Sequence, residues 1–240
     1  MSEKVDILAI GAHPDDIELG CGGTLIKEIE MGKKVGLLDL TQGELGTRGN
    51  KEIRKNEAEL SKNEMGAVFR DNLFLDDCFF ENNRDNQIQL ISKIRRYRPE
   101  IIICNAPDDR HIDHQKAAKL VIDACFLSGL KKIKTSLEGN LQDVWRPMNV
   151  YHYIQWKNLE PDFLVNISDY LNKKLILINC YKSQFFNPKE SNDNTPISTK
   201  NFLDSITYRA RDLGRLVGVE AAEGFIASRF PLINSITELK

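Results

Sequence analysis

The chain has 240 residues, a length that suits one large α/β domain or two small ones and allows a sizeable core. Its composition is 41% hydrophobic and 28% charged with a net charge of -2, far from the basic profile of nucleic-acid-binding proteins. We therefore expect no nucleic-acid partner and look for a small-molecule ligand.

The five cysteines are scattered and none are spaced C-x-x-C, which excludes an obvious disulfide framework or thiolate zinc knuckle. No apolar run approaches the ~18 to 20 residues that a membrane span requires, and the N-terminus lacks the pattern of a secretion signal. We expect a soluble cytoplasmic protein that does not associate with a membrane.

Short apolar runs alternate with segments of helical periodicity along most of the chain. Strands are predicted at 5–10, 34–40, 72–75, 100–104, 150–154 and 163–167. Helices are predicted at 22–34, 51–65, 87–97, 111–128 and 168–181, the last with Ser168 or Asp169 as N-cap. The polar segment 187–199 is predicted to be a mobile loop.

This alternation is typical of βαβ units. The sequence has no internal repeat and no low-complexity linker. We therefore predict a single α/β domain over residues 1–240, with a Rossmann-like, mostly parallel sheet that is flanked by helices.

Polar loops follow three of the predicted strands. HPDD comes after the first strand, TQGELGTRG after the second, and APDDRHIDH after the fourth. Ligands of open α/β sheets bind outside the carboxyl ends of the strands, so these three loops should share one rim of the sheet.

The first and third of these loops carry groups that bind metals. Three of the four histidines lie in them together with five aspartates: His13, His111, His114, Asp15, Asp16, Asp108, Asp109 and Asp113. Imidazoles with a carboxylate form a common zinc ligand set, and three protein ligands with an open position are typical of catalytic zinc. His13 and Asp16 could reach one metal together, with either His111 or His114 as the third ligand.

The remaining groups suggest hydrolytic chemistry. Adjacent side chains in a tight turn usually point apart, so we expect Asp15 not to share the metal with Asp16 and to be free to act as general base. The histidine that does not bind the metal would face the negative charge that develops on a substrate carbonyl. Asp113 would orient an imidazole or pair with an arginine.

Other roles are open for some of these residues. Asp15 or Asp16 could cap the following helix, and Gly20, Gly22 and Gly23 could belong to a nucleotide-binding module that needs no metal. Their spacing does not match the dinucleotide or P-loop patterns. His152 lies in a strand-like segment and is interpreted as a core histidine.

Two arginines on the same rim are candidates for binding an anionic substrate group. Arg48 belongs to the glycine-rich loop, and Arg110 precedes His111. Guanidinium groups bind carboxylates with two parallel hydrogen bonds.

With AHPDD at 12–16 and HIDH at 111–114, the chain resembles the LmbE-like, or PIG-L-like, zinc-dependent N-deacetylases. The resemblance covers nearly the whole chain. YKSQF at 181–185 and GVEAAEGF at 218–225 are similar to the bacillithiol-biosynthesis branch of that family.

The resemblance implies a role for each residue that matches the family pattern. His13, Asp16 and His114 would bind zinc, with another divalent metal such as Fe2+ left open, and Asp15 would be the general base. His111 would stabilise the oxyanion or protonate the leaving amine. Asp113 and Arg54 would form a supporting charge pair.

The implied substrate is N-acetylglucosaminyl malate, with Arg110 and Arg48 near the malate and Gln184 on the substrate side. Alternatives with the same metal chemistry are an amidase of thiol conjugates and a deacetylase of another N-acetyl sugar. The resemblance also implies a homo-oligomer.

Overall fold

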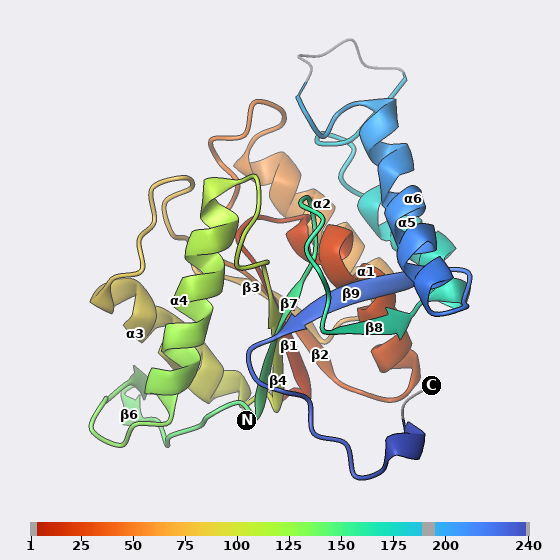
Figure 1. The fold of residues 1–240 in the computed structure, drawn as a ribbon. Helices are drawn as coiled ribbons and strands as arrows, with labels where there is room; N and C mark the ends of the chain where they lie inside the picture. Colours follow the sequence, from red (N-terminus) through yellow and green to blue (C-terminus); the bar gives the residue numbers. More distant parts are fainter. Residues whose placement is uncertain (1–3, 189–194, 239–240) are drawn as a thin grey trace.

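The computed structural model describes residues 4–188 and 195–238. A seven-stranded sheet with the strand order β3-β2-β1-β4-β7-β9-β8 runs through its centre (Figure 1). All neighbouring strands are parallel except at β9, which is antiparallel to both β7 and β8. The predicted α/β class with a mostly parallel sheet is confirmed.

The elements alternate along the chain as the hydrophobic pattern indicates. The strands of the large sheet are β1 Ile7–Gly11, β2 Val35–Asp39, β3 Phe69–Asn72, β4 Ile101–Cys104, β7 Asn149–Tyr153, β8 Phe163–Asn166 and β9 Ala222–Ala227. The helices are α1 Asp16–Glu30, α2 Lys51–Met65, α3 Arg84–Tyr97, α4 Ile112–Ser128, α5 Leu171–Ile178 and α6 Lys200–Leu216. A small hairpin joins β5 Ser136–Leu137 to β6 Asn140–Leu141, and η1 Ser168–Tyr170 and η2 Ile236–Glu238 are short 3-10 turns. Within the described ranges, no helix has the length and apolar character needed to cross a membrane.

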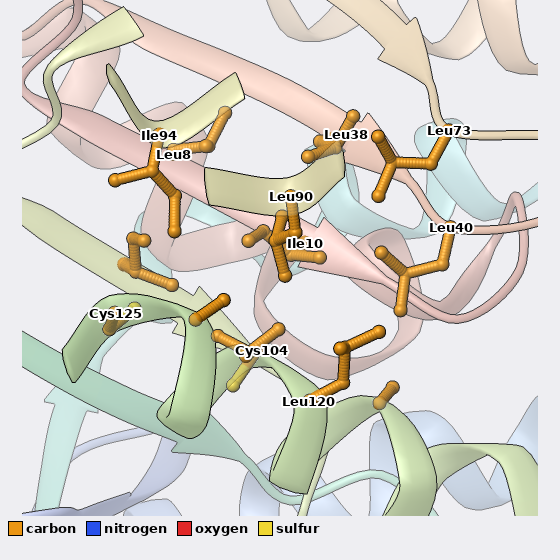
Figure 2. Packing of buried hydrophobic residues seen from close by; sticks show 14 of the residues in the cluster. Leu8, Ile10, Leu38, Leu40, Leu73, Leu90, Ile94, Cys104, Leu120 and Cys125 are labelled. Atoms are coloured by element: carbon orange, nitrogen blue, oxygen red, sulfur yellow. The ribbon is translucent and has the colours of Figure 1, made fainter. Parts of the chain in front are cut away.

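Each face of the sheet has its own hydrophobic core, because successive side chains of a strand point to opposite faces. Leu8 and Ile10 of β1 pack with Leu90 of α3 and Leu120 of α4, as Figure 2 shows. On the opposite face, Ile7 and Ala9 of β1, Leu37 of β2 and Ile103 of β4 form a second core. They share it with Ile17 and Leu25 of α1 and Leu177 of α5.

The glycines near the start of α1 allow close packing. A Cβ on Gly20 would lie 2.1 Å from the Tyr153 ring, and a Cβ on Gly23 would lie 2.9 Å from Ile167. The helix is kinked at Cys21, where φ is -142°. Gly20, Gly22 and Gly23 are all buried inside this helix. They therefore form no exposed phosphate-binding loop of the kind that the nucleotide-binding alternative requires.

The kink leaves backbone amides that the helix itself does not satisfy, and a distant carboxylate accepts their hydrogen bonds. Glu223 of β9 accepts from the amides of Gly23 at 3.0 Å and Thr24 at 2.7 Å. The buried Lys174 donates to the same carboxylate at 2.6 Å. The first helix is therefore tied to a strand 200 residues further along the chain.

The local predictions differ from the structure in four places. The first helix covers Asp16–Glu30 and not 22–34, because it begins within the HPDD turn and Gly32, with a φ of 87°, follows its end. The third strand covers Phe69–Asn72, and the apolar Leu73 and Leu75 follow it instead of forming it, because Phe74 between them has a φ of 55°. Ser168 and Asp169 belong to a 3-10 turn, and Tyr170 precedes α5 without a side-chain cap. Elements α6 and β9 were not predicted. Of the predicted loop 187–199, residues 189–194 lie outside the described ranges.

Candidate active site

A cavity of about 280 Å³ opens beyond the carboxyl ends of β1, β4 and β7. Nine of the ten predicted site residues line it: His13, Asp15, Asp16, Arg48, Arg54, Arg110, His111, His114 and Gln184. The tenth, Asp113, is fully buried and contacts His13. The three polar loops therefore meet at the carboxyl ends of the parallel strands, as expected.

The carboxylate of Asp16 lies between two imidazoles. Its Oδ1 is 3.2 Å from Nε2 of His114, and its Oδ2 is 3.4 Å from Nδ1 of His13. Asn105 and Gln155 donate hydrogen bonds to the same carboxylate at 3.1 and 2.6 Å. Two tertiary contacts therefore fix the orientation of Asp16.

Both imidazoles are held from behind by further carboxylates. Nε2 of His13 lies 3.1 Å from Asp77 and 3.2 Å from Asp113. Nδ1 of His114 lies 2.8 Å from Asp109. Carboxylates that accept from one ring nitrogen are the usual support of histidines whose other nitrogen binds a metal.

The pKa values reflect this crowding of charge. Burial lowers the pKa of His13, but hydrogen bonds to three carboxylates outweigh it and raise the pKa well above its ordinary value. For His114, burial also lowers the pKa, and the carboxylates of Asp16 and Asp109 raise it to about 9. Burial raises the pKa of Asp16, but the charge of His114 and hydrogen bonds to both imidazoles bring it well below the usual range. The cluster thus attracts positive charge strongly.

The donor set fits a divalent metal. In a tetrahedral zinc site, with ligand atoms about 2.0 to 2.1 Å from the ion, those atoms lie roughly 3.3 Å apart. The contacts of Asp16 with His114 and His13, at 3.2 and 3.4 Å, are close to this spacing, with one carboxylate oxygen facing each imidazole. One ring nitrogen from each of His13, His111 and His114 lies within 4.8 Å of the other two, so either histidine of the second motif is near enough to be a ligand.

A second group of potential ligands combines His13 with Asp77 and Asp113. Its carboxylates already accept backbone hydrogen bonds, from Leu45 to Asp77 at 2.9 Å and from Cys78 to Asp113 at 2.8 Å. Both also accept from the His13 ring. We therefore interpret these two aspartates as supports of His13 and place the candidate metal centre at Asp16.

Asp15 is buried beside Arg54. Its backbone has a φ of 114°, in the left-handed region, and Nη2 of Arg54 lies 3.1 Å from its Oδ2. Burial raises the pKa of Asp15 to about 7, although the guanidinium of Arg54 lowers it. The side chain makes no capping hydrogen bond to α1. A carboxylate that titrates near neutrality can exchange protons at physiological pH.

The predicted charge pair of Asp113 and Arg54 is wrong. Arg54 extends from α2 to Asp15 and to the carbonyl oxygens of Pro14 and Gly43, whereas Asp113 contacts His13 and Lys116. The reason is the direction of α2, which aims the arginine at the loop after β1 and not at the start of α4.

His111 stands at the N-cap of α4. Its Nδ1 accepts a hydrogen bond from the backbone amide of Asp113 at 3.3 Å, which leaves the proton of the neutral ring on Nε2. Burial and the positive charges of His13 and His114 lower its pKa to about 4. The ring is therefore a neutral hydrogen-bond donor beside the candidate metal centre.

The three candidate substrate-binding residues line the same cavity as the metal-type donors. Nη1 of Arg48 lies 3.4 Å from the carbonyl oxygen of Phe185, and the guanidinium of Arg110 stacks 4.5 Å from the Trp156 ring centroid. Gln184 donates to the carbonyl oxygen of Arg48 at 2.8 Å. Both guanidinium groups border the same space.

The sequence indicated no individual role for four polar residues of the site: Asp77, Asn105, Asp109 and Gln155. Of these, only Asp109 was among the metal-type groups of the predicted loops. Each follows a strand at the same rim of the sheet, and Asp109 lies within the quoted APDDRHIDH loop. Position after a strand was therefore the signal that could have found them. His152, in contrast, is a buried histidine that hydrogen-bonds to the carbonyl oxygen of Asn105, as predicted.

Comparisons with known proteins agree on one family. The sequence model of the PIG-L family, described as GlcNAc-PI de-N-acetylase, matches residues 8–125. A diacetylchitobiose deacetylase of Thermococcus kodakarensis is 30% identical over 190 residues, which cover 75% of this chain and 70% of the relative.

Solved structures show the same fold over nearly the whole chain. A conserved protein of Thermus thermophilus matches with a TM-score of 0.84 and 32% identity, over 97% of this chain and 98% of its own. The N,N'-diacetylchitobiose deacetylase of Pyrococcus horikoshii matches with a TM-score of 0.77 over 98% of this chain and 88% of its own. At 24% identity, this second likeness concerns the fold alone.

Proposed function

The chain belongs to the PIG-L family of N-deacetylases, and on this premise we propose that it uses zinc to remove the acetyl group from N-acetylglucosaminyl malate, a step of bacillithiol biosynthesis. The observation that carries the proposal is the meeting of metal-type donors with a buried, separate carboxylate. His13, Asp16 and His114 would hold the ion, and Asp15 stands beside them with a pKa near 7.

Zinc, when bound, acts as a Lewis acid that polarises a carbonyl group and makes water more acidic. The residues of the chain then have to remove a proton from the attacking water and support the charge on the acetyl oxygen. They also have to deliver a proton to the leaving nitrogen.

Asp15 would take the proton of the attacking water. Its carboxylate is separate from that of Asp16, and Arg54 fixes its direction through a 3.1 Å contact. A base with a pKa near the working pH combines a large deprotonated fraction with useful basicity. Once protonated, Asp15 can hand the proton to the amine nitrogen as the carbon–nitrogen bond breaks.

His111 would stabilise the negative charge on the acetyl oxygen. The ring is neutral near pH 7 because its pKa is lowered to about 4, and its Nδ1 already accepts from Asp113. Nε2–H is therefore available to donate into the cavity, as in other preorganised oxyanion sites.

Arg48 and Arg110 would bind the carboxylates of the malate. Both line the cavity and both carry planar guanidinium groups, which suit carboxylates. A second candidate substrate is a disaccharide such as diacetylchitobiose, which the 30% identity with the Thermococcus enzyme favours. The chemistry at the acetyl group would be the same.

The test is acetate release by the zinc-loaded protein from three substrates: N-acetylglucosaminyl malate, N,N'-diacetylchitobiose and N-acetylglucosamine. We expect a large preference in kcat/KM for the malate conjugate and loss of activity after metal is removed with a chelator. A preference for diacetylchitobiose would favour the second candidate. Absence of acetate release from all three would contradict an amino-sugar deacetylase.

A further inference from the structure

The segment YKSQF, residues 181–185, follows α5 and connects three parts of the site; we call it the YKSQF strap. The hydroxyl of Tyr181 donates to Glu18 of α1 at 2.9 Å. Ser183 donates from its amide and its hydroxyl to the carboxylate of Glu57 on α2, both at 2.7 Å. The strap is thus anchored on two helices that flank the cavity.

Between these anchors, the strap contacts the loop that carries Arg48. Both donor positions of the Gln184 amide are used, toward the carbonyl oxygen of Arg48 at 2.8 Å and toward the hydroxyl of Ser183 at 2.9 Å. In return, Nη1 of Arg48 lies 3.5 and 3.4 Å from the carbonyl oxygens of Gln184 and Phe185. The backbone and the side chain of Arg48 are both held by the strap.

The glycine-rich loop that carries Arg48 packs closely against the strap. Gly49 has a φ of 75°, and a Cβ there would lie 2.8 Å from Oγ and 3.1 Å from Cβ of Ser183. Gly43, Gly46 and Gly49 make the loop flexible on its own, because glycine restricts the backbone least. The loop has a few hydrogen bonds of its own, such as that from the amide of Gly46 to the carbonyl oxygen of Gly43, and contacts with the strap add to its order.

We propose that Gln184 is a positioning residue that holds Arg48 in the wall of the cavity, so that it determines selectivity for substrates whose leaving amino sugar carries a carboxylate. This inference rests on the proposed function, since it assigns Arg48 to an anionic group of the substrate. From the sequence, Gln184 is expected on the substrate side. Its amide donors are already occupied, so we infer that it acts through Arg48 instead of donating to the substrate. An arginine that is ordered before binding loses less entropy when the carboxylate arrives.

The first experiment measures the loop without any substrate. Gln184→Met keeps the length of the side chain and removes both amide donors. Hydrogen–deuterium exchange of peptides covering 41–50 should become faster in this variant than in the wild type. Lys182→Met is the matched control, because Lys182 is an exposed neighbour in the same strap, and its exchange should equal that of the wild type.

The second experiment measures selectivity. The ratio of kcat/KM for N-acetylglucosaminyl malate to that for N-acetylglucosamine should fall about tenfold or more in Gln184→Met, the size expected for a weakened charge-assisted hydrogen bond. The loss should appear mainly in KM. Arg48→Met should reduce the ratio at least as much, and the double variant should show no further loss, because both changes remove one interaction.

The outcomes separate this inference from the proposed function. Unchanged exchange in Gln184→Met overturns the positioning role whatever the substrate is. Faster exchange with an equal loss for both substrates, or additive losses in the double variant, overturns the selectivity role. A wild-type protein that does not prefer the acidic conjugate overturns the proposed substrate, while the exchange data still report on the strap.

Discussion

Asp109 holds His114 through a contact of 2.8 Å between its Oδ2 and Nδ1 of the imidazole. The other ring nitrogen is thereby directed at Asp16. Asp109→Asn should lower metal affinity by about 10- to 100-fold, as is typical for the carboxylate partner of a metal-binding histidine. The measurement is a zinc titration in competition with a chelator. Asp108→Asn is the control because Asp108 is exposed and contacts Lys157 and Gln115 instead. Equal affinity of both variants would refute the supporting role.

Asp15→Asn should separate metal binding from catalysis. The change keeps the shape of the side chain and removes its basicity, so kcat for acetate release should fall about a hundred- to ten-thousandfold. Zinc content by elemental analysis should stay at the wild-type level, whereas His13→Ala and His114→Ala should lose metal. Full turnover by Asp15→Asn would rule out this residue as the base.

Removal of Arg54 should shift the pH dependence of the reaction. The guanidinium lowers the pKa of Asp15, so Arg54→Gln should let that pKa rise above its value of about 7. A base must be deprotonated to act, and activity is lost as the pH falls through its pKa. The acidic limb of the kcat/KM profile should therefore move to higher pH, by about one unit or more. Arg54→Lys retains the charge and should move it less, and the exposed Lys55→Gln should leave it in place.

Arg70 should be essential for stability. Its side chain is 4% exposed and contacts the buried carboxylates of Glu18 at 2.6 Å and Asp39 at 2.7 Å. Arg70→Leu would leave these two buried carboxylates without their cationic partner and should cost about 3 to 5 kcal/mol of unfolding free energy. Urea denaturation measures this loss. Lys93→Leu breaks the partly exposed pair with Asp71 and should cost far less; a similar loss in both variants would contradict the explanation.

Two glycines in one helix should respond differently to the same change. Gly20→Ala places a Cβ 2.1 Å from the Tyr153 ring and should destabilise the protein by about 1 to 3 kcal/mol. At Gly22 the nearest side-chain atom would be 3.4 Å away, so Gly22→Ala should stay within about 1 kcal/mol of the wild type. Thermal denaturation compares them. A reversed order would show that contact with Tyr153 does not determine the need for glycine.

Local sequence signals predicted the bounds of a helix well where neighbouring residues cap both of its ends. The helix expected at 51–65 has those bounds, because Asn50 accepts hydrogen bonds from Glu52 and Ile53 and Gly66 ends it in the left-handed conformation. The third strand is predicted at 72–75 and lies at Phe69–Asn72, because the charged Arg70 and Asp71 are not typical of a sheet. Residues distant in the sequence neutralise their charges, and no local pattern reveals such partners.

For the candidate site too, one part could be predicted from the sequence and another could not. The positions of strand ends were sufficient to predict that the HPDD and HIDH loops meet. Which side chains pair could not be predicted, since Arg54 is directed by the orientation of α2 and reaches Asp15 instead of Asp113. The pairing of Asp77 with His13 likewise depends on how a loop after β3 folds back over the rim.

The contact of Glu223 with the kink in α1 has a consequence for the order of folding. Gly23 and Thr24 receive their acceptor only when a strand about 200 residues later joins the sheet. During synthesis, the ribosome has to translate most of the chain before the helix that begins with Asp16 can reach its final shape. We expect nascent chains that stop before β9 to have a loosened first helix. The candidate site would then reach its final geometry late in folding, although the HPDD loop is among the first segments to be synthesised.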